Sequence, residues 1–299
     1  MLSGHNIEDR NRSNDEEEMF RHLLFFIIGS LHIRNFRIFA DMKLTFLGTG
    51  TSQGVPVIGC HCEVCQSEDR RDCRLRTAAL VEVGGLAIAI DAGPDFRYQM
   101  LRAKVERLDA ILLTHQHKDH TGGIDDVRAF NFVDYPTIRT MHIYANEPTT
   151  MAMLKDFDYA FATDKYRGVP VIELHTFDEQ QPFMVGCVEV TPIVGHHSER
   201  FRSVGYRFGN FAYITDFSAI DEAELRKLEG VECLVVNALR WEPHDSHFSV
   251  EEALQLIERV GAKRAYLTHM SHRIGLHAEA EQRLPAGVHF AYDGLTIEI

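Results

Sequence analysis

Three imidazoles and one carboxylate lie within six consecutive residues, as His115, His117, Asp119 and His120. Imidazole and carboxylate groups are typical zinc ligands in proteins. The apolar run at 110–113 directly precedes them and predicts a strand that is buried on both faces. Because His115 and His117 are two residues apart in an extended segment, we expect them to face the same side and bind one metal. Asp119 and His120 would then face a neighbouring metal position.

A second cluster consists of Cys60, Cys62 and Cys65, three thiols within one short segment. Structural zinc takes four ligands in a closed tetrahedron, so three thiolates leave one position to be filled. The other cysteines, Cys73, Cys187 and Cys233, are scattered, and we expect them to be core or surface thiols. This distribution indicates a metal site rather than a disulfide framework.

The segment 50–54 offers a rival chemistry, because its sequence GTSQG matches the G-x-S-x-G pattern of serine hydrolases. In those enzymes the serine lies on a turn between a strand and a helix. Here Val55-Pro56-Val57 follows, which prevents a helix from starting at Ser52. We therefore interpret the segment as a turn at the rim of the metal site.

The composition is that of an ordinary globular protein. The 299 residues are 45% hydrophobic and 25% charged, which fits about two domains or one large α/β domain. The net charge is −13, which disfavours nucleic-acid binding driven by electrostatics.

Strand and helix patterns alternate from Met42 onward. Strands are predicted at 44–47, 79–83, 86–90, 110–113, 141–145, 171–174, 187–194, 204–208, 211–214, 233–236, 264–268 and 295–298. Helices are predicted near 120–130, 147–157, 249–260 and 277–284. The chain therefore belongs to the α/β class.

Residues 1–41 differ in composition from the rest, and we interpret them as an N-terminal extension of uncertain role before a domain at 42–299. Their apolar stretch at 23–28 is too short to span a bilayer. The acidic run at 15–18 precedes it and argues against a signal peptide. We expect a cytoplasmic protein without a membrane partner.

The histidine-rich segment resembles the metallo-β-lactamase superfamily, because residues 115–120 match its H-x-H-x-D-H motif in full. The resemblance covers residues 43–299 and implies an αββα sandwich, in which two mixed sheets are flanked by helices. It also implies a dinuclear metal site at the sheet edges and supplies three more ligands, which match His197, Asp216 and His269. Of the two neighbouring histidines, His197 rather than His196 is the one we assign as the ligand.

The resemblance implies a role for each ligand. His115, His117 and His197 would hold one metal; Asp119, His120 and His269 would hold the other; Asp216 would bridge the two. Asp91 matches a carboxylate that orients ligands in this superfamily. An equally good interpretation of Asp91 is a helix cap before Pro94.

The cysteine segment is similar to the G-C-x-C-x-x-C loop of one subgroup, the PhnP-like cyclic-phosphate phosphodiesterases. That likeness implies that His272, three residues after His269, completes a structural zinc site. It also implies that His247 points into the active site without binding metal. The alternative is a solvated loop histidine.

Two metals can ionise a bridging water at neutral pH and neutralise charge on an attacked phosphate. Such a site suits hydrolysis of esters, lactams, thioesters and phosphodiesters alike. The likeness of the cysteine loop, completed by His272, to the phosphodiesterase subgroup implies a phosphodiesterase that hydrolyses a small phosphate ester, cyclic esters included, with a metal-bound hydroxide. Asp119 and His247 are the predicted catalytic residues, and His247 would protonate the leaving alkoxide. The predicted cofactors are two zinc or manganese ions in the active site and one structural zinc.

Three other functions are compatible with the sequence. One alternative is a nuclease resembling the transfer-RNA 3′-processing enzymes, which share the seven ligands. The acidic charge and the lack of a Gly/Pro-rich basic arm in the sequence argue against a nucleic-acid partner. Further alternatives are another hydrolase of the superfamily and a non-catalytic metal-binding module. The sequence leaves open whether the protein is a homodimer.

Overall fold

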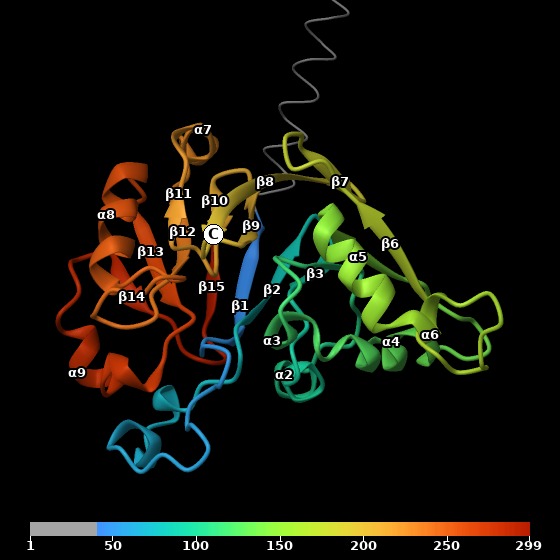
Figure 1. Cartoon of the computed structure of the whole chain (residues 1–299), viewed down its shortest axis with the longest axis horizontal. Coiled ribbons are helices and arrows are strands. Elements are labelled where there is room, and N and C mark those ends of the chain that lie inside the picture. Colours follow the sequence, from blue (N-terminus) through green and yellow to red (C-terminus); the bar gives the residue numbers. More distant parts are fainter. Residues whose placement is uncertain (1–40) are drawn as a thin grey trace, which may run out of the picture.

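The computed structural model describes residues 41–299, so the predictions for residues 1–40 lie outside the described residues. In the described part, two mixed β-sheets pack face to face and helices lie on the outer side of each (Figure 1). This arrangement confirms the predicted αββα sandwich.

The first sheet has seven strands in the order β15-β1-β2-β3-β4-β5-β6. Strands β3 to β6 run parallel to one another, and the remaining pairs are antiparallel. The strands are β1 (Lys43–Gly48), β2 (Ala78–Val83), β3 (Leu86–Ile90), β4 (Ala110–Leu112), β5 (Met141–Ala145), β6 (Ile172–Thr176) and β15 (Thr296–Glu298).

The second sheet has eight strands, in the order β11-β8-β9-β10-β12-β13-β14 with β7 paired to β8. Its parallel part consists of β10, β12, β13 and β14. The strands are β7 (Phe183–Val185), β8 (Val188–His197), β9 (Phe201–Phe208), β10 (Phe211–Tyr213), β11 (Ala219–Ile220), β12 (Cys233–Asn237), β13 (Arg264–Thr268) and β14 (Val288–Phe290).

Helices cover the outer faces of both sheets (Figure 1). The α-helices are α2 (Phe96–Ala103), α3 (Lys118–Thr121), α4 (Arg128–Phe132), α5 (Glu147–Asp156), α6 (Asp158–Phe161), α7 (Glu222–Leu225), α8 (Val250–Val260) and α9 (His277–Glu281). The short 3-10 helices are η1 (Val64–Gln66), η2 (Arg70–Asp72), η3 (Ile124–Val127), η4 (Arg226–Leu228) and η5 (His272–Ile274). None of the helices within 41–299 is long and apolar enough to cross a membrane.

Three apolar clusters hold these layers together. One lies between the sheets, the second between the first sheet and helices such as α2 and α5, and the third between the second sheet and helices such as α8 and α9. Each sheet is therefore covered on both faces. This explains why parallel strands such as β4, buried at every residue, read as continuous apolar runs.

Helix α8 illustrates how local sequence sets an element. Ser249 caps its first turn and forms a reciprocal capping box with Glu252. Gly261 ends the helix with φ of 73°, a left-handed conformation that glycine adopts without a Cβ clash. The buried residues recur with helical spacing and pack on the second sheet: Val250, Ala253, Leu256 and Ile257.

Every predicted strand has a counterpart, whereas the helix predicted at 120–130 is wrong. The chain forms α3, then η3, then α4, because Gly122 and Gly123 interrupt it. The Gly123 amide donates to the Ala92 carbonyl at 2.8 Å, and a Cβ on Gly123 would lie 2.0 Å from the Gly93 oxygen. The loop after β3 therefore packs against the glycines and bends the chain. Helix α9 also ends at Glu281, before the predicted position 284.

Candidate metal centre

The candidate ligands lie where strands of both sheets end. Asp91 follows β3, residues 115–120 follow β4, Asp216 follows β10 and His269 follows β13. Asp91, Asp216 and His269 have φ angles of 66°, 61° and 58°. This left-handed backbone is uncommon for residues other than glycine and is concentrated at functional sites in proteins. Strands β3, β10 and β13 thus turn sharply at Asp91, Asp216 and His269.

The first ligand group contains three histidines. His115 Nε2 lies 2.9 Å from His117 Nδ1, and His197 Nε2 lies 3.2 Å from the same atom. Burial, reinforced by neighbouring histidines, lowers the pKa of both His115 and His117. Their rings are therefore neutral at pH 7, which is the form that binds metal. Three imidazole nitrogens that converge in this way fit a cation between them, because hydrogen bonds alone cannot pair all three.

The second group contains Asp119, His120 and His269, whose ligand atoms lie within 4.8 Å of one another. His120 Nε2 is 3.2 Å from Asp119 Oδ2. Nevertheless, His120 Nε2 and both ring nitrogens of His269 are buried without a hydrogen-bond partner among the described residues. Buried polar atoms are rarely left unpaired. The ligand atoms of this group therefore lie close together without forming hydrogen bonds to one another, as expected for ligands that are directed at one ion.

Asp216 lies between the two groups. Its Oδ1 is 3.1 Å from His269 Nε2 and 4.0 Å from His197 Nε2, and its Oδ2 is 3.3 Å from His120 Nε2. Burial by itself would raise the pKa of Asp216, but His269 and His120 outweigh it and hold the pKa well below its usual range. The carboxylate is therefore ionised and within reach of both groups.

The electrostatics of the second group also favour a cation. Burial by itself would lower the pKa of His120, but Asp216, Asp91 and Asp119 outweigh it and raise the pKa well above its usual range. Three carboxylates around one buried imidazole leave this position rich in negative charge. A divalent cation would balance that charge and take the place of the proton on the ring.

Two hydrogen bonds orient the ligand rings from outside. Asp91 is completely buried, and its Oδ2 lies 2.6 Å from His120 Nδ1. The Ser246 carbonyl lies 2.9 Å from His197 Nδ1. Each oxygen accepts the Nδ1 proton and so leaves Nε2 free to face the centre. The N-cap position of α2 is occupied by Asp95, so the structure does not support the alternative interpretation of Asp91 as a helix cap.

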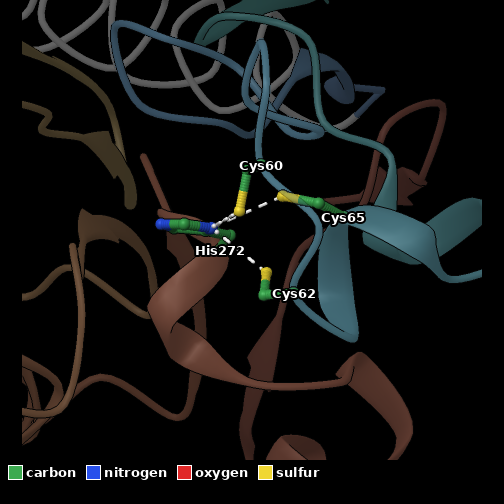
Figure 2. A group of neighbouring side chains, drawn as sticks. All are labelled: Cys60, Cys62, Cys65 and His272. Carbon is green, nitrogen blue, oxygen red and sulfur yellow. Dashed lines mark hydrogen bonds between the residues drawn. The ribbon is translucent and has the colours of Figure 1, made fainter.

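The cysteine cluster lies against η5. The sulfurs of Cys60, Cys62 and Cys65 lie 3.3, 3.3 and 3.4 Å from one atom, Nδ1 of His272 (Figure 2). One ring nitrogen can share only one proton, so three sulfurs around it fit a ligand set better than a hydrogen-bond network. A hydrogen bond from the Cys65 backbone lowers the pKa of the Cys62 thiol to about 6. Thiolates and imidazole in this arrangement fit a closed zinc site.

His247 points into the centre rather than into solvent. Its side chain is only 12% exposed, and its Nε2 lies 3.1 Å from Asp216 Oδ1. The ring stacks on His269 with centroids 4.8 Å apart. Burial lowers the pKa of His247 to about 4. By contrast, His196 is exposed and lies 3.1 Å from Asp221, away from the candidate ligands.

A cavity of about 1010 Å³ adjoins the three-histidine group. Gln116 and Phe201 are among its lining residues, and the Phe201 ring lies 5.0 Å from the His117 ring. Arg200 and Arg202 also line it, and within residues 41–299 neither forms an ion pair with a carboxylate. The same lining carries Glu147, Asp178 and Glu179, so the cavity presents charges of both signs near the candidate metals.

Residues 87–270 match the family model of the beta-lactamase superfamily domain. The chain belongs to the metallo-β-lactamase superfamily. This chain is similar to a solved structure described as a new diphosphatase from the PhnP family, with 39% identity and a TM-score of 0.79. The match covers 86% of this chain and 98% of that one.

Two curated relatives extend the comparison. A ribonuclease Z from Mycobacterium sp. (strain KMS) is 27% identical over 275 residues. The match covers 83% of this chain and 91% of the relative. An octanoyltransferase from Porphyromonas gingivalis (strain ATCC BAA-308 / W83) is 39% identical over 256 residues, which cover 85% of this chain. Those residues make up 51% of the relative, so the chain spans about half of its length.

The structure places the residues that the sequence analysis selected in two separate groups, one around Asp216 with Asp91 and His247 beside it, and one around His272. Sequence reasoning missed Thr114, whose amide and hydroxyl donate to Asp91, and Ser246, whose carbonyl faces His197. It also missed the two cavity arginines, Arg200 and Arg202. Ser246 acts through its backbone carbonyl, which carries no side-chain signal. The arginines had a weak signal, because the segment Arg200-Phe201-Arg202 comes shortly after His197.

Proposed function

We propose that this superfamily hydrolase cleaves a small phosphate diester, cyclic diesters included, at a dinuclear metal centre. The observation that carries the proposal is the convergence of two ligand groups on either side of Asp216. His115, His117 and His197 would hold one metal, Asp119, His120 and His269 the other, and Asp216 both. Bound zinc or manganese would supply a strong nucleophile from water and neutralise the charge that develops on phosphorus.

The choice of phosphate esters among the reactions of the superfamily rests on the cysteine loop. Cys60, Cys62 and Cys65 surround His272, which follows the ligand His269 by three residues. A structural zinc there would fix the loop beside the centre. The 39% identity to a diphosphatase from the PhnP family supports the same substrate class, in which phosphorus is attacked.

His247 is the group we propose as proton donor to the leaving oxygen. Because burial lowers its pKa to about 4, the ring is neutral in the free site at pH 7. A phosphate anion seated beside it would favour the protonated ring and raise its pKa. The proton would then be available in the substrate complex, where the departing alkoxide needs it. Ser246 Oγ, 2.8 Å from His247 Nδ1, would hold the ring in this orientation.

A diphosphate ester is the second candidate substrate, and the two cavity arginines favour it. Among residues 41–299, neither Arg200 nor Arg202 forms an ion pair with the carboxylates that line the same cavity, so both guanidinium groups are available to a second phosphate. Guanidinium groups bind phosphate oxygens through paired, charge-assisted hydrogen bonds. A second phosphate reaching into the cavity would meet this charge.

A nuclease activity has less support. The chain carries a net charge of −13, and the cavity lining includes Glu147, Asp178 and Glu179. A polyanionic RNA would be repelled by this charge at long range. The 27% identity to a ribonuclease Z keeps RNA among the substrates to be tested.

The test is a substrate panel assayed with purified, metal-loaded protein. It contains a cyclic phosphate diester, a linear diester, a diphosphate ester and a precursor transfer RNA. We expect hydrolysis of a small diester that Asp216→Ala abolishes and that the matched variant His196→Ala retains. Arg202→Ala should raise KM for the diphosphate ester more than for the single-phosphate diesters. Cleavage of RNA alone, or activity that survives in Asp216→Ala, would contradict the proposal.

A further inference from the structure

A third cluster of ligand-type side chains lies outside the catalytic centre, on the first sheet. It consists of His142 on β5 and Glu173 and His175 on β6. Strand β6 is the edge strand of this sheet (Figure 1). His142 pairs with Glu173 in the parallel register, and Tyr144 pairs with His175. Because side chains alternate between the faces of a strand, all three ligand-type residues project from one face. The opposite face of β5 packs under the helices through Met141 and Ile143.

The distances within the cluster match a metal site. His142 Nδ1 lies 3.0 Å from His175 Nε2, and the Glu173 carboxylate lies 3.6 Å from the first nitrogen and 3.7 Å from the second. Zinc bonds of about 2.0–2.1 Å place neighbouring ligands of a tetrahedron about 3.3 Å apart. The corresponding spacings in the candidate catalytic centre are 2.9–4.0 Å. The new cluster therefore has nearly the same dimensions.

Neighbouring side chains already hold the cluster in shape. Tyr144 stacks on His175 with a centroid distance of 4.5 Å and an angle of 17° between the ring planes. The ring of Phe183 on β7 stacks in turn on the ring of Tyr144, with the centroids 5.6 Å apart. A ligand that is fixed before binding loses little conformational entropy when a metal arrives. The side chains of His142 and His175 are 41% and 31% exposed, so an ion can reach them from solvent.

We propose that His142, Glu173 and His175 bind a further divalent zinc-type ion, with the remaining coordination position open to water. Two imidazoles and one carboxylate form a ligand set that zinc commonly takes. The ion would join edge strand β6 to β5 independently of the catalytic reaction. Strand β6 continues into Thr176, Phe177 and Asp178, which line the cavity beside the centre. Binding would therefore stiffen one wall of that cavity.

The test is zinc binding to the full-length protein. Protein whose other sites are already loaded is titrated with Zn²⁺ by calorimetry, and total zinc is counted by elemental analysis. We expect the wild type to bind one more zinc per chain than His142→Ala and His175→Ala. Glu173→Gln should weaken this zinc at least about tenfold, because it replaces an anionic ligand by a neutral one.

His289→Ala is the matched control, because His289 is 50% exposed and lies 2.7 Å from Glu281, and no second histidine within residues 41–299 pairs with it. It should retain the extra zinc. Removal of the His175 ring can also disturb Tyr144, so the His142→Ala variant, which leaves that stack intact, must give the same result. Equal zinc counts and equal titrations in the wild type, His142→Ala and His175→Ala would overturn the proposal.

Discussion

Replacement of Asp91 by asparagine tests whether the carboxylate controls the metal centre. Asp91 Oδ1 accepts the Thr114 amide at 2.8 Å, while Oδ2 accepts the His120 Nδ1 proton at 2.6 Å. Asparagine has one oxygen and one amino group, so it can accept only one of these two protons. If the amino group faces His120, the ring must carry its proton on Nε2, which is the atom that would bind metal.

The expected loss can be estimated from this single contact. Removal of a group that orients a metal ligand weakens metal affinity by about 10–100-fold. At about 1.36 kcal/mol for each factor of ten, this equals about 1.4–2.7 kcal/mol. A hydrogen bond to a charged group contributes a similar amount, about 1.5–3 kcal/mol. The Asp91→Asn variant should therefore bind zinc 10–100-fold more weakly at one of its catalytic positions.

The assay is competition for zinc between the protein and a chromogenic chelator, with thermal unfolding measured in parallel. Asp293→Asn is the matched control, because Asp293 is also buried, with 4% exposure, and accepts the amides of Thr49 and Leu75 at 2.9 Å. It should lose thermal stability without losing zinc affinity. Wild-type zinc affinity in Asp91→Asn, or an equal loss of affinity in both variants, would refute the reasoning.

Three further predictions concern other residues. Cys62→Ser should release one zinc and lower the melting temperature by about 2–4 °C for each kcal/mol of unfolding free energy that is lost. Replacement of the exposed Cys73 by serine should do neither. An unchanged melting temperature in Cys62→Ser would show that the three thiols do not stabilise the fold. His247→Ala should slow hydrolysis of diesters with alkoxide leaving groups by about 10²–10⁴-fold, and it should slow hydrolysis of a nitrophenyl diester far less. Equal losses of rate on both substrates would contradict the role of His247 as proton donor. Burial, together with the positive charges of Arg71 and Arg74, lowers the pKa of His277. As the pH falls below about 6.5, the unfolded chain therefore takes up a proton that the folded chain does not, and the free energy of unfolding decreases. His277→Gln should flatten this loss in urea unfolding between pH 7 and pH 5.5, and an unchanged slope would contradict the assignment.

Features that depend on neighbours along the chain could be predicted from the sequence. The apolar run before His115 predicts a buried strand, because a strand covered on both faces excludes polar residues. The spacing of His115 and His117 predicts that both face one side. The cysteine loop likewise carries three of its four candidate ligands within one segment. Family likeness was needed for the distant ligands, because nothing local in the sequence pairs His197 with His117.

Features that depend on packing could not be predicted in this way. The helix expected at 120–130 breaks because the loop after β3 contacts Gly123, and that contact exists only in the folded chain. The Ser246 carbonyl orients His197 from 49 residues away. The edge cluster forms because the parallel register of β5 and β6 brings His142 to Glu173 and His175.

The sequence by itself therefore determined the ligand-type side chains that lie close together along the chain, at 115–120 and at 60–65, and the strand that precedes the first of these segments. Residues two or three apart have a geometry set by the backbone, so their spacing is informative without a fold. The tertiary structure alone decided which of these groups meet, which oxygens fix the tautomers of their rings, and that Arg200 and Arg202 line a cavity beside them. The physical reason is that strand register and sheet packing, which join residues far apart in the chain, result from the burial of the whole core.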